Sequence, residues 1–213
     1  MGTVIQVLDY GSGNLFSIEN ALRGASDSIN VKVSSRFESG KVDALVLPGV
    51  GSFSSAQEIL SENKAEILEE VGSNKLPLLG ICLGMQLLFE KSKEGPGEGL
   101  SIFKGGVERF TKPKNGTLKI PHMGWNTVEV GSKSKFCSGL APTEWAYFVH
   151  SYFPLPKDKA IVRAWTSYGR RRFASIVEQG NVFGTQFHPE KSQAFGRKLI
   201  SNFARLAEAR AKK

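Results

Sequence analysis

The chain has 213 residues, 40% of them hydrophobic, and a formal net charge of +8. This length suits one domain with a substantial core, so we expect a single domain over residues 1–213 and no second catalytic domain. No apolar run approaches the roughly 18 residues of a membrane span, and no basic leader precedes the first strand-like run, so we expect a cytoplasmic protein that binds no membrane.

The first half of the chain alternates strand-like and helical stretches. We expect strands at Val4–Leu8, Val31–Val33, Val42–Leu47 and Leu76–Ile81, and helices at Asn14–Arg23, Gln57–Val71 and Met85–Glu90. Such alternation predicts a parallel sheet with crossover helices. The loop before the first helix is similar to a dinucleotide fingerprint, but Phe16 stands where the third glycine is required. Asn14 is better interpreted as the N-cap of that helix.

From about Val107 the pattern changes to short strands and turns. We expect strands at Thr127–Val130, Trp145–Val149, Ala160–Trp165, Phe173–Glu178 and Val182–Phe187, and a last helix at Gln193–Ala209. The predicted fold class is therefore α/β: an open, mostly parallel sheet with flanking helices, to which the C-terminal half adds antiparallel or mixed strands.

A glycine-rich loop, Pro48–Phe53, follows the third predicted strand. At the carboxyl end of a strand such a loop exposes backbone N–H groups. The backbone N–H of Gly49 or Val50 and the backbone N–H of Leu83 could together form an oxyanion hole. Each such donor stabilises the transition state by about 3–4 kcal/mol. A plain turn from strand to helix is the alternative interpretation.

Cys82 is the leading candidate for a nucleophile. It stands between Gly80 and Gly84, after an apolar run and before a helical stretch, where a sharp strand-to-helix elbow requires glycine on both sides. A helix N-terminus favours the thiolate form of a cysteine. The alternative is a small buried core residue. Cys137 has no such elbow and is interpreted as incidental, and two cysteines form no disulfide framework.

His188 is the leading candidate for the base among the chain's three histidines. It comes directly after the strand-like run Val182–Phe187, and Glu190 follows two residues later, on the same side of an extended segment. Glu190 could therefore orient the imidazole as the third member of a triad. An ordinary turn at His188-Pro189-Glu190 is the alternative.

Other signals are weak. His122 and His150 lack a cysteine or carboxylate at ligand spacing, so we expect no metal, and we expect no cofactor. The one dense basic run, Arg170–Arg172, sits in a predicted hairpin without a recognition helix. It favours a solvated turn, or a patch facing an acidic partner chain, over a nucleic-acid site.

Three strings, Leu47–Gly51, Gly80–Gln86 and Phe187–Ser192, together resemble the class I (triad) glutamine amidotransferases. The likeness covers nearly the whole chain and implies a flavodoxin-like architecture. Three further strings are similar to one branch of that family, the glutaminase subunits of imidazole glycerol phosphate synthases, which act in histidine biosynthesis; they are Asp9–Asn14, Pro121–Asn126 and Tyr147–Tyr152.

The resemblance implies glutamine hydrolysis to glutamate and ammonia. The Cys82 thiolate would attack the glutamine carboxamide, and His188 would protonate the departing ammonia and then activate water against the glutamyl thioester. Gln86, one helical turn beyond Cys82, could hold the amino-acid end of the substrate. The resemblance adds weaker substrate-binding candidates, namely Gly51, Glu94, Ser151 and Tyr152. A solvated loop carboxylate is the alternative for Glu94.

Ammonia released into water is protonated and lost as a nucleophile, so the acceptor site must lie on another chain. The resemblance implies a (β/α)8 cyclase subunit in a heterodimer, docked on a turn-rich patch that comprises His122, Met123, Trp125 and Asn126. A core aromatic is the alternative for Trp125. Since Val50 lies between two glycines, its peptide could rotate from a carbonyl to an N–H near Cys82 when the partner docks.

Other functions stay open at this point. The chain could serve a different synthase, for anthranilate, pyridoxal phosphate, purine or guanylate, although anthranilate-type domains tend to have proline at the position of Val50 and histidine at that of Met85. It could be a non-catalytic scaffold that only binds a partner. A peptidase or chaperone of the flavodoxin-like cysteine superfamily is a further alternative, but such proteins do not usually combine Gln86 with His188-Pro189-Glu190.

Overall fold

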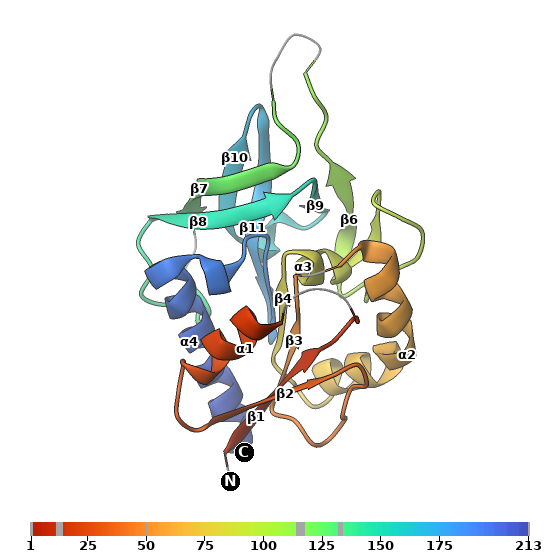
Figure 1. The fold of residues 1–213 in the computed structure, drawn as a ribbon, viewed down its shortest axis with the longest axis vertical. Coiled ribbons are helices and arrows are strands. Elements are labelled where there is room, and N and C mark those ends of the chain that lie inside the picture. Colours follow the sequence, from red (N-terminus) through yellow and green to blue (C-terminus); the bar gives the residue numbers. More distant parts are fainter. Residues whose placement is uncertain (1, 12–14, 50, 114–117, 132–133, 213) are drawn as a thin grey trace.

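The computed structural model of the chain describes residues 2–11, 15–49, 51–113, 118–131 and 134–212. Within these ranges it contains two sheets and the helices shown in Figure 1. The nine-stranded sheet comprises β1 Thr3–Leu8, β2 Ile29–Ser34, β3 Ala44–Leu47, β4 Leu78–Ile81, β7 His122–Val130, β8 Thr143–His150, β10 Val162–Tyr168, β11 Arg171–Gln179 and β12 Val182–Thr185. The helices are α1 Phe16–Arg23, α2 Phe53–Gly72, α3 Leu83–Leu87 and α4 Gln193–Ala211, with 3-10 turns η1 Lys159–Ile161 and η2 Pro189–Lys191.

The large sheet has the strand order β2-β1-β3-β4-β12-β11-β10-β7-β8. Its first five strands are parallel, and every pair from β12 to β8 is antiparallel. The expected α/β fold with an antiparallel extension is confirmed, and the antiparallel part is as large as the parallel part by number of strand pairs. Strand β12 joins the two parts, since it pairs with β4 in parallel and with β11 in antiparallel orientation.

Two apolar cores lie on opposite faces of the parallel strands. Side chains alternate between the faces, as the two-residue period of a strand requires. Val46 of β3 belongs to the cluster under α1 and α4, whereas Leu45 and Leu47 belong to the cluster under α2 and α3. Figure 1 shows these two helix pairs on either side of the sheet. The continuous apolar runs of β3 and β4 reflect burial on both faces.

The helix expected at Met85–Glu90 is shorter than predicted. It ends at Leu87, and the chain turns into strand β5 Phe89–Ser92, which pairs with β6 Phe103–Arg109. Strand β9 Tyr152–Pro156 completes this three-stranded sheet. The sequence pattern predicted none of its three strands. Phe89 is fully buried and its ring packs against that of Phe103 at 5.6 Å. Tertiary packing of this aromatic pair therefore overrides the helical periodicity.

The stretch Pro121–Asn126, predicted to be rich in turns, belongs largely to a strand. Strand β7 begins at His122 and pairs with β8 in an unbroken register from His122↔His150 to Glu129↔Thr143. Successive residues therefore face opposite sides of this hairpin, and residues two apart face the same side.

Glycine is required where α3 meets the sheet. A Cβ atom on Gly84 would overlap the Leu47 carbonyl group, and one on Gly80 would lie 2.5 Å from the Gly84 carbonyl oxygen. Both contacts are to backbone atoms, which cannot rotate away. Strands β3 and β4 and helix α3 are thus packed closer than any side chain allows.

We predict that Gly84→Ala lowers the free energy of unfolding by about 1–3 kcal/mol, because two backbone segments must separate to admit the methyl group. Gly72→Ala is the matched control: the added Cβ at this last residue of α2 would meet nothing within 4 Å, so the variant should be neutral or up to about 1 kcal/mol more stable. Urea unfolding measures both, and equal stability of the two variants would contradict the close packing at Gly84.

Candidate active site

Cys82 occupies the sharp turn between β4 and α3. Its backbone has φ 48° and ψ −101°, a conformation that residues with side chains rarely adopt. Hydrogen bonds hold the turn on both sides: the Cys82 N–H donates to the Thr185 carbonyl at 2.6 Å, and the Gln86 N–H donates to the Cys82 carbonyl at 3.2 Å. The side chain therefore stands at the carboxyl end of the parallel strands, at the N-terminus of a helix.

His188 and Glu190 follow the neighbouring strand, β12. His188 Nδ1 lies 2.7 Å from Glu190 Oε1, and both side chains are almost fully buried. The other carboxylate oxygen, Oε2, is buried and makes no hydrogen bond within the described part of the chain. Burial by itself lowers the pKa of His188, but the neighbouring Cys82 and the Glu190 carboxylate raise it to about 10. This arrangement favours the imidazolium form of His188 beside Cys82.

The backbone of His188 is fixed by strand β8. Its N–H donates to the Tyr147 carbonyl at 3.0 Å, and its own carbonyl accepts from Ser192 Oγ at 2.6 Å. Ser192 Oγ in turn accepts from the Tyr147 N–H at 3.0 Å. His188 is thus connected to the parallel part of the sheet through β12, which precedes it in the chain, and to the antiparallel part through its hydrogen bond with β8.

Gly49 lies between the cysteine and the histidine. A Cβ atom on it would sit 2.8 Å from His188 Cε1 and 2.9 Å from Cys82 Cβ, so the loop after β3 packs directly on both side chains. Leu83 is the first residue of α3, and its N–H has no partner within the helix. Val50, the other predicted donor, lies outside the described residues, as does Asn14, the predicted N-cap.

A cavity of about 200 Å³ opens onto Cys82 and Leu83. All five residues predicted to bind substrate line it, namely Gly51, Gln86, Glu94, Ser151 and Tyr152. Burial raises the pKa of Glu94, which is therefore not a fully solvated carboxylate. Pro121, Val149 and His150 also line the cavity and were not predicted. Pro121 directly precedes β7, and Val149 and His150 belong to β8; no local pattern reveals the pairing of these two strands.

The Gln86 amide is held by two acceptors. Its Nε2 donates to the Tyr152 carbonyl at 3.1 Å and to Gln186 Oε1 at 3.2 Å. The Gln186 amide donates in turn to Cys82 Sγ at 3.6 Å. Gln186, fully buried, was also not predicted; its position two residues before His188 was the one signal available.

The predicted partner surface divides into two faces. His122 is 3% exposed and points into the core, so it offers no surface to a partner, and Asn126 on the same face is half-buried. Met123 and Trp125 lie on the opposite face at 63% and 45% exposure, which excludes a core role for Trp125. Trp145, exposed on the neighbouring strand opposite Thr127, was not predicted to belong to this surface.

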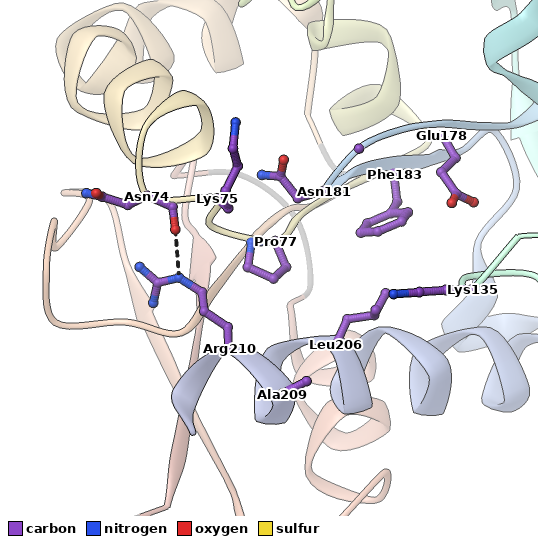
Figure 2. Close-up of a pocket in the computed structure, with 11 residues that line it drawn as sticks. Asn74, Lys75, Pro77, Lys135, Glu178, Asn181, Phe183, Leu206, Ala209 and Arg210 are labelled. Carbon is purple, nitrogen blue, oxygen red and sulfur yellow. Dashed lines mark hydrogen bonds between the residues drawn. The ribbon is translucent and has the colours of Figure 1, made fainter. Parts of the chain in front are cut away.

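A larger hollow, of about 640 Å³, lies away from this site, between the end of α4 and the turn that connects β11 and β12 (Figure 2). None of the predicted site residues lines it. Among the described residues, no cluster of histidine, cysteine and carboxylate groups could hold a metal ion. No helix in the described ranges is both long and apolar enough to cross a membrane.

Comparison with known proteins gives a consistent set of relatives. The family model for class-I glutamine amidotransferases matches residues 6–206. Imidazole glycerol phosphate synthase subunit HisH of Thermosynechococcus vestitus is 42% identical over 208 residues, which cover 96% of this chain and 97% of that protein. The same subunit of Pyrococcus furiosus is 45% identical over 203 residues, covering 95% and 98%. The solved structure of PurLQS from Thermotoga maritima shares the fold with a TM-score of 0.72 at 18% identity, covering 95% of this chain and 98% of that one.

The two cysteines, each 6% exposed, provide a test of the electrostatics. We predict that iodoacetamide labels Cys82 much faster than Cys137 at pH 7, because the positively charged His188 lies beside Cys82 whereas burial raises the pKa of Cys137 to about 11. His188→Ala should slow labelling of Cys82 about 10-fold and leave Cys137 unchanged. Peptide mass spectrometry measures both rates, and faster labelling of Cys137 would refute this pairing.

Proposed function

The chain belongs to the class-I glutamine amidotransferases, in the branch of the HisH subunits, and on that premise we propose that it is the glutaminase subunit of an imidazole glycerol phosphate synthase. The observation that carries this proposal is the convergence of the His188–Glu190 pair on Cys82, which lines one small cavity together with Gly49. The enzyme would act in histidine biosynthesis, in the cytoplasm.

The proposed reaction begins at Cys82. Its thiolate sulfur attacks the carboxamide carbon of glutamine, and the carbonyl oxygen becomes an oxyanion. The N–H groups of Leu83 and of the loop around Gly49 are the proposed donors to that oxyanion. The His188 imidazolium then donates its proton to the amide nitrogen as the carbon–nitrogen bond breaks, which releases ammonia and leaves a glutamyl thioester.

Water completes the proposed cycle. The now neutral His188 takes a proton from a water molecule, whose oxygen attacks the thioester carbon, and cleavage of the carbon–sulfur bond releases glutamate and restores the thiolate. Glu190 keeps the imidazole ring oriented and stabilises its positive charge in both half-reactions. The second carboxylate oxygen of Glu190 is buried and has no hydrogen bond within the described residues. No other donor there therefore competes with the imidazole ring for the negative charge of that oxygen.

Gln86 has a defined part in substrate recognition under this proposal. Because its Nε2 is engaged by Tyr152 and Gln186, the free group of the amide is the oxygen Oε1, which can only accept. It therefore suits the α-ammonium group of glutamine. The Glu94 carboxylate, half-buried in the same cavity, would reinforce the preference for a cation.

The ammonia requires a second subunit, as proposed from the sequence: a (β/α)8 cyclase that forms a heterodimer with this chain and uses the ammonia to make imidazole glycerol phosphate. The proposed docking face consists of Met123, Trp125 and Trp145, whose exposed side chains share one face of the β7–β8 hairpin. His122 does not belong to it. The proposed rotation of the Val50 peptide rests on residue types alone.

We predict that Cys82→Ala lowers glutamine hydrolysis by a factor on the order of 10⁶, and that His188→Ala is nearly as damaging. Glu190→Gln should retain more activity, because an orienting group contributes less than the base it orients. Cys137→Ala, the control, should behave as the wild type. Steady-state assays of glutamate release with the cyclase present measure all four, and turnover by Cys82→Ala would refute the proposed nucleophile.

We predict that the chain alone hydrolyses glutamine slowly and that a cyclase with bound nucleotide ligand raises turnover by roughly 10² to 10³, the contribution expected of one oxyanion donor. Trp125→Ala and Met123→Ala should each weaken cyclase binding about 30-fold, as loss of an interface anchor does. Leu68→Ala, on α2 at 36% exposure, is the control and should leave binding unchanged. Equal turnover with and without cyclase would rule out the activation.

A further inference from the structure

A line of hydrogen bonds crosses the interior from strand β7 toward the nucleophile. Asn126 Nδ2 lies 3.2 Å from His122 Nε2, and His122 Nδ1 lies 3.0 Å from His150 Nε2. His150 Nδ1 lies 2.7 Å from the Tyr152 carbonyl oxygen, the same atom to which Gln86 donates. The His122–His150 pair, which the proposed chemistry does not use, is therefore connected to the glutamine cavity.

The direction of every bond in this line is fixed by its ends. The Tyr152 carbonyl can only accept, so His150 carries its proton on Nδ1 and leaves Nε2 as an acceptor. His122 must then donate from Nδ1 and accept on Nε2, where the Asn126 amide supplies a donor. Each ring thus has one defined tautomer, and every donor points toward the cavity.

Aromatic rings confine both imidazoles. His122 is stacked between Tyr168 at 4.0 Å and Phe148 at 4.7 Å, measured between ring centroids. His150 packs against Phe173 at 5.2 Å and Phe110 at 5.4 Å. Packing on several sides leaves the rings little freedom to rotate, so the atoms that they bind are held in place as well.

Neither ring is suited to proton transfer near neutral pH. Burial lowers the pKa of His122 to about 4, and burial lowers that of His150 to about 3 against the opposing effect of the Tyr152 bond. A second proton on His150 would set its Nε2–H against the Nδ1–H of His122, and one on His122 would set its Nε2–H against the Asn126 amide. A part in positioning fits this pair better than a part in acid–base chemistry.

The line continues to the sulfur. The Tyr152 carbonyl accepts from His150 and from Gln86, so it fixes the Gln86 amide. Gln86 donates to Gln186 Oε1, and Gln186 Nε2 donates to Cys82 Sγ. Loss of the His150 donor would leave the Tyr152 carbonyl held by Gln86 alone, and both amides could then shift.

We propose that His122 and His150 are positioning residues of the glutaminase site: by fixing the Tyr152 carbonyl they orient the Gln86 amide toward the substrate and the Gln186 amide toward Cys82. This inference rests on the proposed function for the identity of the substrate. It assigns the pair no direct contact with the reacting atoms.

The test replaces both histidines by phenylalanine, which retains ring shape and packing and removes both hydrogen-bonding partners together. Phe110→Leu is the control, because it loosens the same aromatic cluster without removing any bond of the line. Glutamine affinity is measured by calorimetry in a Cys82→Ala background, and KM and kcat are measured with the cyclase present.

We expect the double variant to bind glutamine about 10-fold more weakly, with KM raised more than kcat is lowered, and Phe110→Leu to bind as the wild type does. His150→Asn keeps a donor close to the Tyr152 carbonyl and should recover most of the affinity. Wild-type affinity in the double variant, an equal loss in Phe110→Leu, or a His150→Asn variant as weak as the double variant would each overturn the proposal.

A second readout does not depend on glutamine. In a Cys137→Ala background, iodoacetamide labelling of Cys82 should change several-fold in the double variant, because the Gln186 amide no longer has a fixed position beside the sulfur. An unchanged rate would also count against the pair. If the wild-type complex shows no glutaminase activity dependent on Cys82, the proposed function fails, whereas this rate still reports on the positioning.

Discussion

The close approach of three backbone segments around Cys82 is the constraint on which the site depends. The end of β3, the end of β4 and the start of α3 meet at distances that only Gly49, Gly80 and Gly84 allow. This packing turns the chain sharply enough to hold the cysteine in an unfavourable backbone conformation. It also places the loop after β3 on the cysteine and the histidine together. Sheet stability and the geometry of the site are therefore determined by the same contacts.

The three histidines of the chain show how environment decides charge. All three are buried, yet His188 favours its charged form because a thiol and a carboxylate face it, whereas His122 and His150 face only a carbonyl, an amide and aromatic rings. Burial opposes a charge in each case, and a neighbouring anion decides the outcome. One interior thus holds a cation at the nucleophile and a neutral pair behind it. The charge of His188 contributes in turn to the lowered pKa of His150.

Much of the site was predictable because its residues follow strands with strong local signals. The glycines around Cys82, the loop after β3 and the Glu190 that follows His188 each have a local physical reason. The other substrate-binding candidates besides Gln86 came from the family resemblance and not from a local pattern, and all of them line one cavity. The β5-β6-β9 sheet was not predictable, since Phe89 continues a helical period and becomes a strand only through its packing on Phe103. Nor was the burial of His122, which follows from the register of β7 on β8.

The position of β12 has a consequence for how the protein is made. The strand that carries His188 to the site is inserted between β4 and β11, both of which precede it in the sequence. The growing chain leaves the ribosome with Cys82 long before it can supply the histidine, and the gap in the sheet stays open until nearly all of the chain has been synthesised. An incomplete chain therefore contains the thiol but not the histidine that lies beside it in the folded protein. Cys82 and His188 can come together only after synthesis has passed β12.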